Sequence, residues 1–263
     1  MPRESTFHTF TVATALCVVC SVLVSGAAVG LRPKQVANKE LDRQKNIIEA
    51  AGLQDPDKTV EQIFEERIES RLVNLETGEY VEDGDVEFEI ATYDQIEASK
   101  KPGMSDVIAS GDDIAGIGRR EKYSFVYVVK DDGGAVEQVV LPVNGKGLWS
   151  TLYGFLALDA DLKTIRGLTF YQHAETPGLG GEVDNPKWKG LWPGKMAFDD
   201  DGQIVIEVIK GIVGPTTPNP EWKVDGMSGA TITTRGVSNL VRFWLGDNGF
   251  GPYFEKFSAG KGA

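Results

Sequence analysis

The sequence predicts an α+β fold, a mostly antiparallel sheet with flanking helices, preceded by one N-terminal transmembrane helix. Three observations carry this prediction. The run from Phe10 to Leu31 contains no charged residue. Several β-prone segments follow one another across short turns rich in Asp and Gly, which is typical of antiparallel pairing. Amphipathic helical segments lie before and after those strands.

The uncharged run is long enough to cross a bilayer. Its 22 residues would form a helix of roughly 33 Å, against a hydrocarbon core of about 30 Å. A cleaved signal peptide is the alternative, with Arg3 as its basic start and Ser25-Gly26-Ala27 as a cleavage site. Signal cores run about 7–15 residues, so the longer run favours a retained anchor. Cys17 and Cys20 share one face of this helix and are expected to pack against another helix.

Composition excludes several classes of function. Charged residues make up 25% and hydrophobic residues 41%, which predicts a folded chain. The net charge of -12 argues against nucleic acid as a partner. The chain has two histidines and two cysteines, and both cysteines lie in the apolar run. We therefore expect no metal site, no disulfide and no cysteine nucleophile in the soluble part.

Two helices are predicted after the anchor. The first covers Gln35 to Ala51 and ends at Gly52. The second starts at Thr59, where Thr59-Val60-Glu61-Gln62 forms a capping box. Its predicted inner stripe consists of Val60, Ile63, Phe64, Ile68 and Leu72.

Strands are predicted from β-prone runs between turns. Tyr123–Lys130 and Val136–Val143 form a hairpin around Asp131–Gly134. Further strands are expected at Leu152–Leu158 and Ile165–Tyr171, on either side of a turn at Asp159–Asp161, and at Ile204–Ile209 after Asp200–Gly202. A final helix is predicted at Thr234–Leu245, with Gly246 as its C-cap.

Two segments do not read as ordinary elements. His173–Gly181 is rich in glycine and would let a ligand approach the backbone. Asp225–Thr234 combines small residues and hydroxyls with a helix start, whose partial positive charge suits a phosphate. The alternatives are a surface loop for the first segment and a hydroxyl-rich N-cap for the second, with Thr233 or Thr234 capping. From the residues alone, a phosphate or nucleotide site is possible at this point, and no P-loop motif is present.

The second segment resembles a known attachment motif. Asp225-Gly226-Met227-Ser228-Gly229-Ala230-Thr231 is similar to the flavin-attachment motif of the FMN-binding domains in bacterial respiratory pumps. This resemblance implies FMN joined covalently to Thr231 through a phosphoester. It also implies a separate flavin transferase that acts outside the cytoplasmic membrane and makes the bond from FAD.

Most of the chain resembles one branch of these proteins, the C subunits of Na+-translocating NADH:quinone reductases. The segments that carry the resemblance are the anchor, Leu31–Pro33, Asn46–Gly52, Ile117–Arg120, Leu141–Val143, Gly147–Thr151, Glu175–Pro186, Phe243–Gly246 and Gly249–Pro252. On this basis residues 1–9 are an N-terminal tail and 10–31 the transmembrane anchor. Residues 32–95 are a helical and strand lead-in region, and 96–263 are the FMN-binding domain.

The resemblance also implies the site residues. Ser228, Gly229 and Ala230 would set the backbone at the attachment point, and Thr233 and Thr234 would bind the phosphate or ribityl chain. The residues expected to line or approach the flavin ring are Trp149, Glu175, Thr176, Leu179 and Gly180. An apolar wall with a few placed polar groups suits a planar ring, and a covalent bond keeps an anionic cofactor on an acidic domain.

The implied function is electron relay within a larger enzyme, the Na+-transporting NADH:ubiquinone reductase. The sequence has no dinucleotide fingerprint, so the chain is not expected to oxidise NADH alone. Expected partners are the other membrane and peripheral subunits, the flavin transferase and membrane lipid. Two alternatives remain open: the homologous flavin subunit of an ion-pumping ferredoxin:NAD+ reductase, and a membrane-tethered binding module without redox chemistry.

The expected location is the bacterial cytoplasmic (inner) membrane, as a single-pass protein. The implied transferase predicts that residues 33–263 face the periplasm or exterior. The cations after the span argue for the opposite orientation, because the positive-inside rule would keep them in the cytoplasm. They are Arg32, Lys34, Lys39, Arg43 and Lys45. That rule is weak for large translocated domains, so the periplasmic side is preferred.

Overall fold

The structure is a computed structural model and describes residues 6–260. The chain divides after Arg43 into two compact units. Helix α1 (Thr6–Ala51) begins in the first unit, where it is long and apolar enough to cross a membrane, with a mean hydropathy of 2.4 over its most apolar window. This finding rests on length and composition. Of the predicted tail at residues 1–9, positions 1–5, which include Arg3, lie outside the described residues. Residues 6–9 belong to α1.

The predicted separate helix at Gln35–Ala51 is wrong in its start, because α1 is continuous from Thr6. Pro33 lies inside it. The proline φ is compatible with a helix, and α1 continues through Pro33 although the residue removes one backbone hydrogen bond and crowds the preceding turn. The predicted stop is confirmed, since α1 ends at Ala51 and Gly52 follows with φ +68°.

The predicted capping box is confirmed at helix α2 (Val60–Arg67). Gln62 N–H donates to Thr59 Oγ1 (3.3 Å), and Thr59 N–H donates to Gln62 Oε1 (2.8 Å). The predicted apolar stripe is wrong at its far end, because the helix stops at Arg67 and Ile68 opens strand β1 (Ile68–Asn74). Pairing of β1 with its neighbour in the sheet outweighs the helical periodicity of this short segment.

A six-stranded sheet with the order β2-β1-β5-β6-β7-β8 forms the centre of the second unit, and all its neighbouring strands are antiparallel. This confirms the predicted fold class. The four long predicted strands are present, some extended at their ends. The bounds are β2 Tyr80–Val81, β5 Tyr123–Lys130, β6 Val136–Lys146, β7 Thr151–Asp159 and β8 Ile165–Gln172. Strands β1 and β2 come from the predicted lead-in region, so this region contributes to the same sheet.

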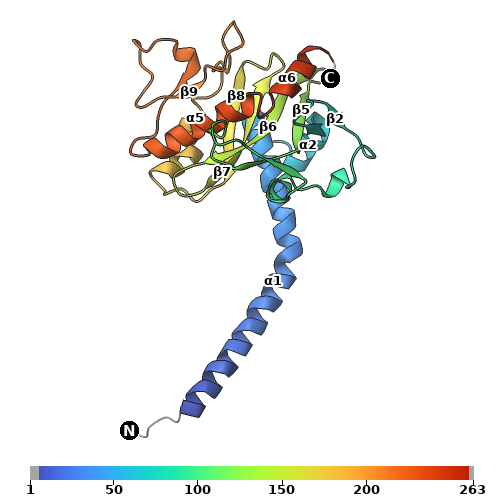
Figure 1. The fold of residues 1–263 in the computed structure, drawn as a ribbon, viewed down its shortest axis with the longest axis vertical. Coiled ribbons are helices and arrows are strands. Elements are labelled where there is room, and N and C mark those ends of the chain that lie inside the picture. The colour runs from blue at the N-terminus through green and yellow to red at the C-terminus, as the bar shows by residue number, and fades with distance from the viewer. Residues whose placement is uncertain (1–5, 261–263) are drawn as a thin grey trace. The chain divides into compact units, whose positions relative to one another are not determined.

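Both faces of the sheet are covered (Figure 1). Helices α5 (Thr231–Leu245) and α6 (Gly251–Ser258) pack on one face with Leu141, Leu156 and Leu240 in the shared core. The end of α1 and helix α2 cover the other face, where Ile47 and Phe155 are buried. Side chains alternate between the two cores along each strand, which is why these strands read as nearly continuous apolar runs.

Smaller elements connect the layers. They are η1 Ile90–Thr92, α3 Gln95–Lys100, β3 Ser105–Val107, β4 Arg119–Glu121, η2 Gly180–Asp184, α4 Pro186–Lys189, β9 Glu207–Val208, η3 Pro220–Trp222 and β10 Lys223–Val224. The predicted strand at Ile204–Ile209 is wrong except at β9, which pairs in parallel with β10. Ile204 instead makes an isolated bridge to Phe198.

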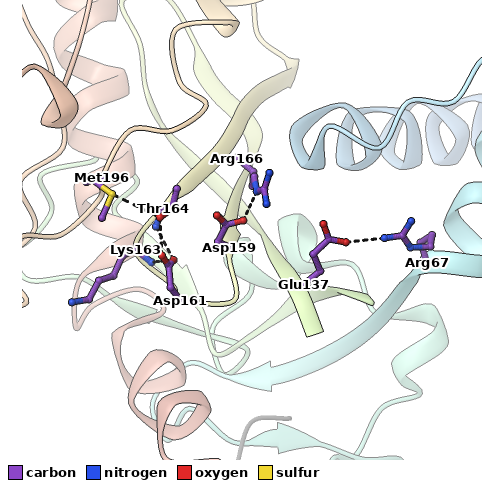
Figure 2. A network of polar contacts seen from close by, with 8 residues as sticks. All are labelled: Arg67, Glu137, Asp159, Asp161, Lys163, Thr164, Arg166 and Met196. Atoms are coloured by element: carbon purple, nitrogen blue, oxygen red, sulfur yellow. Dashed lines mark hydrogen bonds and ion pairs between the residues drawn. The ribbon is translucent and has the colours of Figure 1, made fainter. Parts of the chain in front are cut away.

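Polar contacts tie the sheet together where β6 and β8 begin and β7 ends (Figure 2). Arg67 Nη2 pairs with Glu137 Oε2 (2.8 Å), and Arg166 pairs with Asp159. The predicted turn after Asp159 is confirmed, with Asp161 accepting hydrogen bonds from the backbone N–H groups of Lys163 and Thr164. The candidate site described below lies at the opposite end of the same strands.

Candidate functional site

Three segments meet at the other end of strands β6, β7 and β8. The loop 147–150 joins β6 to β7, and the segment 173–181 follows β8, whose last residue pairs with Tyr153 of β7. The start of α5 lies against the end of β6, since a Cβ built on Gly236 would stand 2.3 Å from the Lys146 carbonyl oxygen. The sheet therefore brings the two segments singled out from the sequence together with a third, the loop that carries Trp149.

Glu175 joins these three segments. Its carboxylate accepts hydrogen bonds from the backbone N–H groups of Leu148 (3.2 Å), Trp149 (2.9 Å) and Ser150 (3.1 Å). It also accepts one from Thr233 Oγ1 (2.7 Å), on the first turn of α5. The side chain is buried. Its hydrogen bonds hold the Trp149 loop against α5, and we call this arrangement the clamp.

Electrostatics keeps this carboxylate ionised. Burial raises the pKa of Glu175, but the hydrogen bonds from Thr233 and from the backbone N–H groups of Trp149, Ser150 and Leu148 outweigh it. The pKa of Glu175 is therefore below its ordinary value. An ionised carboxylate can only accept hydrogen bonds, and the three backbone N–H groups and the Thr233 hydroxyl all donate to it.

Two glycines make room for the clamp. A Cβ on Gly147 would lie 2.6 Å from Glu175 Oε1, and one on Gly180 would lie 2.6 Å from Glu175 Oε2. The Cβ built on Gly180 would also lie 2.6 Å from Thr233 Oγ1. The glycine-rich composition of the 173–181 segment thus serves close packing around a buried carboxylate, in addition to any approach by a ligand.

Apolar side chains stand exposed beside the clamp. Trp149 is 67% exposed and Leu179 is 44% exposed. The Leu179 side chain reaches the attachment segment, because a Cβ on Gly229 would lie 2.9 Å from Leu179 Cδ2. Thr176 is exposed, and its carbonyl oxygen accepts hydrogen bonds from Leu179 N–H (3.1 Å) and Gly181 N–H (2.9 Å). Thr176 thereby fixes the turn that presents Leu179.

The attachment segment ends in an exposed hydroxyl. Ser228, Gly229 and Thr231 are exposed and Ala230 is buried. Helix α5 begins at Thr231, three residues earlier than predicted, with Ala230 at the N-cap position. The prediction that Thr233 or Thr234 is the N-cap is wrong, since both lie inside the helix and are buried. Thr234 Oγ1 instead accepts a hydrogen bond from Met227 N–H (3.2 Å).

Thr231 also lines a cavity of about 290 Å³, and sequence reasoning missed it. We call it the α5 groove. One wall is a stripe of α5, and the other is formed by residues 207–211 with Gly226 and Met227. The α5 wall consists of Thr231, Thr234, Arg235, Ser238, Asn239 and Arg242. The spacing of these polar residues by three, four, seven, eight and eleven positions is the sequence signal that could have revealed this face.

Comparisons with known proteins show the family to which the chain belongs. The FMN-binding domain family matches residues 147–246, which include the Trp149 loop, Glu175, the attachment segment and α5. The chain is 47% identical over 262 residues to the C subunit of the Na(+)-translocating NADH-quinone reductase of Pseudomonas aeruginosa, covering 98% of each chain. It is 46% identical over 259 residues to the C subunit from Vibrio alginolyticus, again covering 98% of each chain.

Solved structures show the same fold. The crystal structure of Shewanella oneidensis NqrC matches with a TM-score of 0.75 and 36% identity, over 85% of this chain and 99% of that one. The crystal structure of the C subunit from Parabacteroides distasonis matches with a TM-score of 0.63 and 28% identity, over 86% and 96% of the two chains. By identity and by coverage, the chain belongs to the family of Na(+)-translocating NADH-quinone reductase C subunits.

Proposed function

We propose that this chain is the electron-relay subunit of a membrane-bound Na+-translocating NADH:quinone reductase, with FMN held covalently at Thr231. The observation that carries the proposal is the position of the Thr231 hydroxyl. It is exposed at the start of α5 and lines the cationic α5 groove, and Gly229, two residues before it, lies against the exposed side chain of Leu179. The names of the relatives and the FMN-binding family match support it.

The residues present fit FMN. A flavin ring has two apolar faces. The exposed Leu179 side chain offers apolar surface next to the attachment segment, and the exposed Trp149 side chain offers more on the loop that Glu175 joins to α5. A phosphate carries negative charge, and the groove beside Thr231 is lined by three cations and one carboxylate. In the proposed attachment the Thr231 hydroxyl oxygen bonds to the FMN phosphorus of FAD, the pyrophosphate bond breaks, and AMP leaves with the hydroxyl proton.

The chain's own residues position and enclose the cofactor. Bound FMN supplies reversible electron transfer, the chemistry that the protein side chains lack. Glu175 holds the Trp149 loop against α5, and Thr176 holds the turn that carries Leu179. Because the hydroxyls of Thr233 and Thr234 are engaged with Glu175 and Met227, we assign these threonines to shaping the helix start.

A relay needs partners. The anchor alone cannot set the distance from the flavin to an electron donor and an acceptor, so docking onto other subunits must do so. The chain is therefore inactive on NADH by itself and acts as part of the complex in the inner membrane. The domain faces the periplasm, where a flavin transferase can reach Thr231.

In-gel flavin fluorescence tests the proposal. The denatured wild-type chain should fluoresce under ultraviolet light, and Thr231→Ala should abolish the signal while leaving the fold intact. Thr216→Ala is the matched control, because this exposed threonine lies outside the attachment segment. Fluorescence that persists in Thr231→Ala would overturn the assignment and move it to Thr233 or Thr234.

A further inference from the structure

The α5 groove carries an excess of positive charge in an acidic protein. Its lining contains Lys210, Arg235 and Arg242 against one carboxylate, Glu207, while the whole chain has a net charge of -12. Within the described residues none of these three cations forms an ion pair, and all three side chains are exposed. Unpaired cations that line one cavity form a site suited to an anion.

The cations are not spread evenly along the groove. Val208 N–H donates to Ser238 Oγ (3.3 Å), so strand β9 faces the middle of α5. From there the chain runs toward the helix start, because Gly226 N–H donates to the Gly211 carbonyl (2.8 Å) and the neighbouring Met227 N–H donates to Thr234. Lys210 therefore belongs to the Thr231 end of the groove.

Helical spacing places the arginines. Arg235 lies four residues after Thr231, which is about one turn along the same face of α5. Arg242 lies eleven residues after Thr231, roughly three turns away. Glu207 precedes Val208 on β9, so it belongs to the end of the groove that holds Arg242. The excess positive charge is thus concentrated next to the Thr231 hydroxyl.

We infer that Lys210 and Arg235 form the anion subsite that binds the phosphodiester linking flavin to Thr231. This inference rests on the proposed function, since it supplies the phosphate for which the two cations are placed. A guanidinium offers several donors to phosphate oxygens, and an ammonium adds a second positive charge from the facing wall. The subsite fixes the start of the flavin chain on the side of α5 that faces the groove.

Phosphorus NMR of the loaded full-length chain in detergent tests this subsite. The chain is loaded with purified flavin transferase and FAD, and loading is measured by intact mass. The phosphodiester resonance of the native wild type should differ from that of the denatured chain. In the double variant Lys210→Gln/Arg235→Gln it should move toward the denatured position, while Arg242→Gln, a cation of the same groove at its far end, should leave it unchanged.

Charge-retaining variants separate the subsite from recognition by the transferase. Lys210→Arg/Arg235→Lys should load and keep the resonance near its wild-type position, because the charges remain. If the double glutamine variant fails to load while this variant loads normally, the requirement for charge is supported. A wild-type resonance in a loaded double glutamine variant would overturn the inference, as would an equal shift in Arg242→Gln or a failure of both double variants to load.

The outcome is distinguishable from a failure of the proposed function. If the wild-type chain shows neither added mass nor a protein-bound phosphodiester after loading, the covalent attachment itself is wrong. If the wild type is loaded at Thr231 and the double glutamine variant keeps its resonance, the attachment stands and the assignment of Lys210 and Arg235 falls.

Discussion

Glu175 shows how one buried charge can hold three segments of a candidate ligand site together. Its carboxylate joins the backbone of the Trp149 loop to the hydroxyl of Thr233 on α5, and two glycines leave space for it. The sequence resemblance implies that Glu175 lines the flavin ring. In the structure its oxygens face the loop and the helix, so its effect on a ring would pass through the position of Trp149.

Glu175→Gln should loosen the Trp149 loop without preventing flavin attachment. The amide removes the negative charge and replaces one acceptor with a donor that faces other donors. We expect covalent FMN to remain, with an altered absorption spectrum and faster proteolysis of the loop around residues 147–150. Glu182→Gln is the control, because Glu182 contacts Asn185 and lies outside the clamp. An unchanged spectrum and unchanged proteolysis in Glu175→Gln would contradict the clamp.

Apolar contact with the ring can be tested separately from attachment. Leu179→Ala and Trp149→Ala should each keep covalent FMN but alter its absorption spectrum or slow its reduction, because each removes an exposed apolar surface from one of the loops that Glu175 holds together. Ile212→Ala is the control, since Ile212 is exposed but lies outside the loops that meet at the clamp. Spectra identical to the wild type in both variants would place the ring elsewhere.

At the scale of elements, local pattern predicted the long strands and helix α5. The prediction that this helix is the last element is wrong, because α6 (Gly251–Ser258) follows it. Tyr123–Lys130 and Ile165–Tyr171 combine β-branched and aromatic residues with turn signals, and local chemistry suffices there. Ile68 and Leu72 were assigned to a helix because their spacing continues the stripe of α2. Pairing of β1 with β5 decides their conformation, and a pairing between segments so distant in the chain leaves no local signal.

The candidate site could be read only in part from the sequence, because a local signal exists only where the residues are contiguous. Motif resemblance singled out Thr231 and the 173–181 segment, since each is contiguous in the sequence. The clamp and the α5 groove depend on residues distant in sequence, such as Glu175 with Thr233 and Lys210 with Arg235. The fold creates these neighbourhoods, so reading either segment alone could not reveal them.

The end of α1 should behave as part of the folded domain. Ile47 is fully buried against the sheet, so Ile47→Ala should lower the free energy of unfolding of the second unit by about 2–5 kcal/mol. Val36 lies on the same helix but is 63% exposed, so Val36→Ala is the control and should change the free energy of unfolding little. Denaturant unfolding of the full chain in detergent measures both. Equal effects of the two substitutions would contradict the packing of α1 on the sheet.

Strand β4 carries a second buried carboxylate, Glu121. Burial raises its pKa to about 7, against opposing effects from its own backbone N–H, Arg120 and Ser124. Between its ordinary pKa of 4.5 and about 7, the folded chain binds more protons than the unfolded chain. Stability should therefore fall as pH rises through that window, by up to about 3 kcal/mol.

Glu121→Gln should remove this dependence. The variant should be more stable than the wild type at pH 8 and similar to it at pH 4, as measured by denaturant unfolding at both values. Glu137→Gln is a control on the surface of the same unit, where Glu137 pairs with Arg67. A Glu121→Gln variant with the wild-type pH dependence would show that Glu121 does not titrate in the predicted window.

At the scale of the whole molecule, one apolar helix and one acidic domain suit a tethered subunit. The proposed periplasmic location of the domain rests on the proposed attachment, because the sequence resemblance implies a transferase that acts outside the cytoplasmic membrane. Protease added to spheroplasts should digest residues after the span, while a cytoplasmic marker protein stays intact. Protection of the domain in sealed spheroplasts would contradict the periplasmic orientation and favour the direction indicated by the cations after the span.

Dependence on partners is a second property of the whole molecule. The purified chain should be reduced by dithionite yet show negligible NADH:quinone turnover. Adding it to a complex that lacks this subunit should restore turnover, and the Thr231→Ala form should not. Rapid NADH-driven quinone reduction by the lone chain would contradict the relay, because it would require a nucleotide site of its own.

The central claim is that the chain carries flavin at one threonine, and peptide mass spectrometry tests it most directly. The chain is isolated from its native membrane, denatured and digested, and the peptide that contains residues 225–234 is sequenced in the gas phase. The account predicts that this peptide is heavier by one FMN minus one water, with the added mass on Thr231. An unmodified peptide, or added mass located on Thr233 or Thr234, would contradict it.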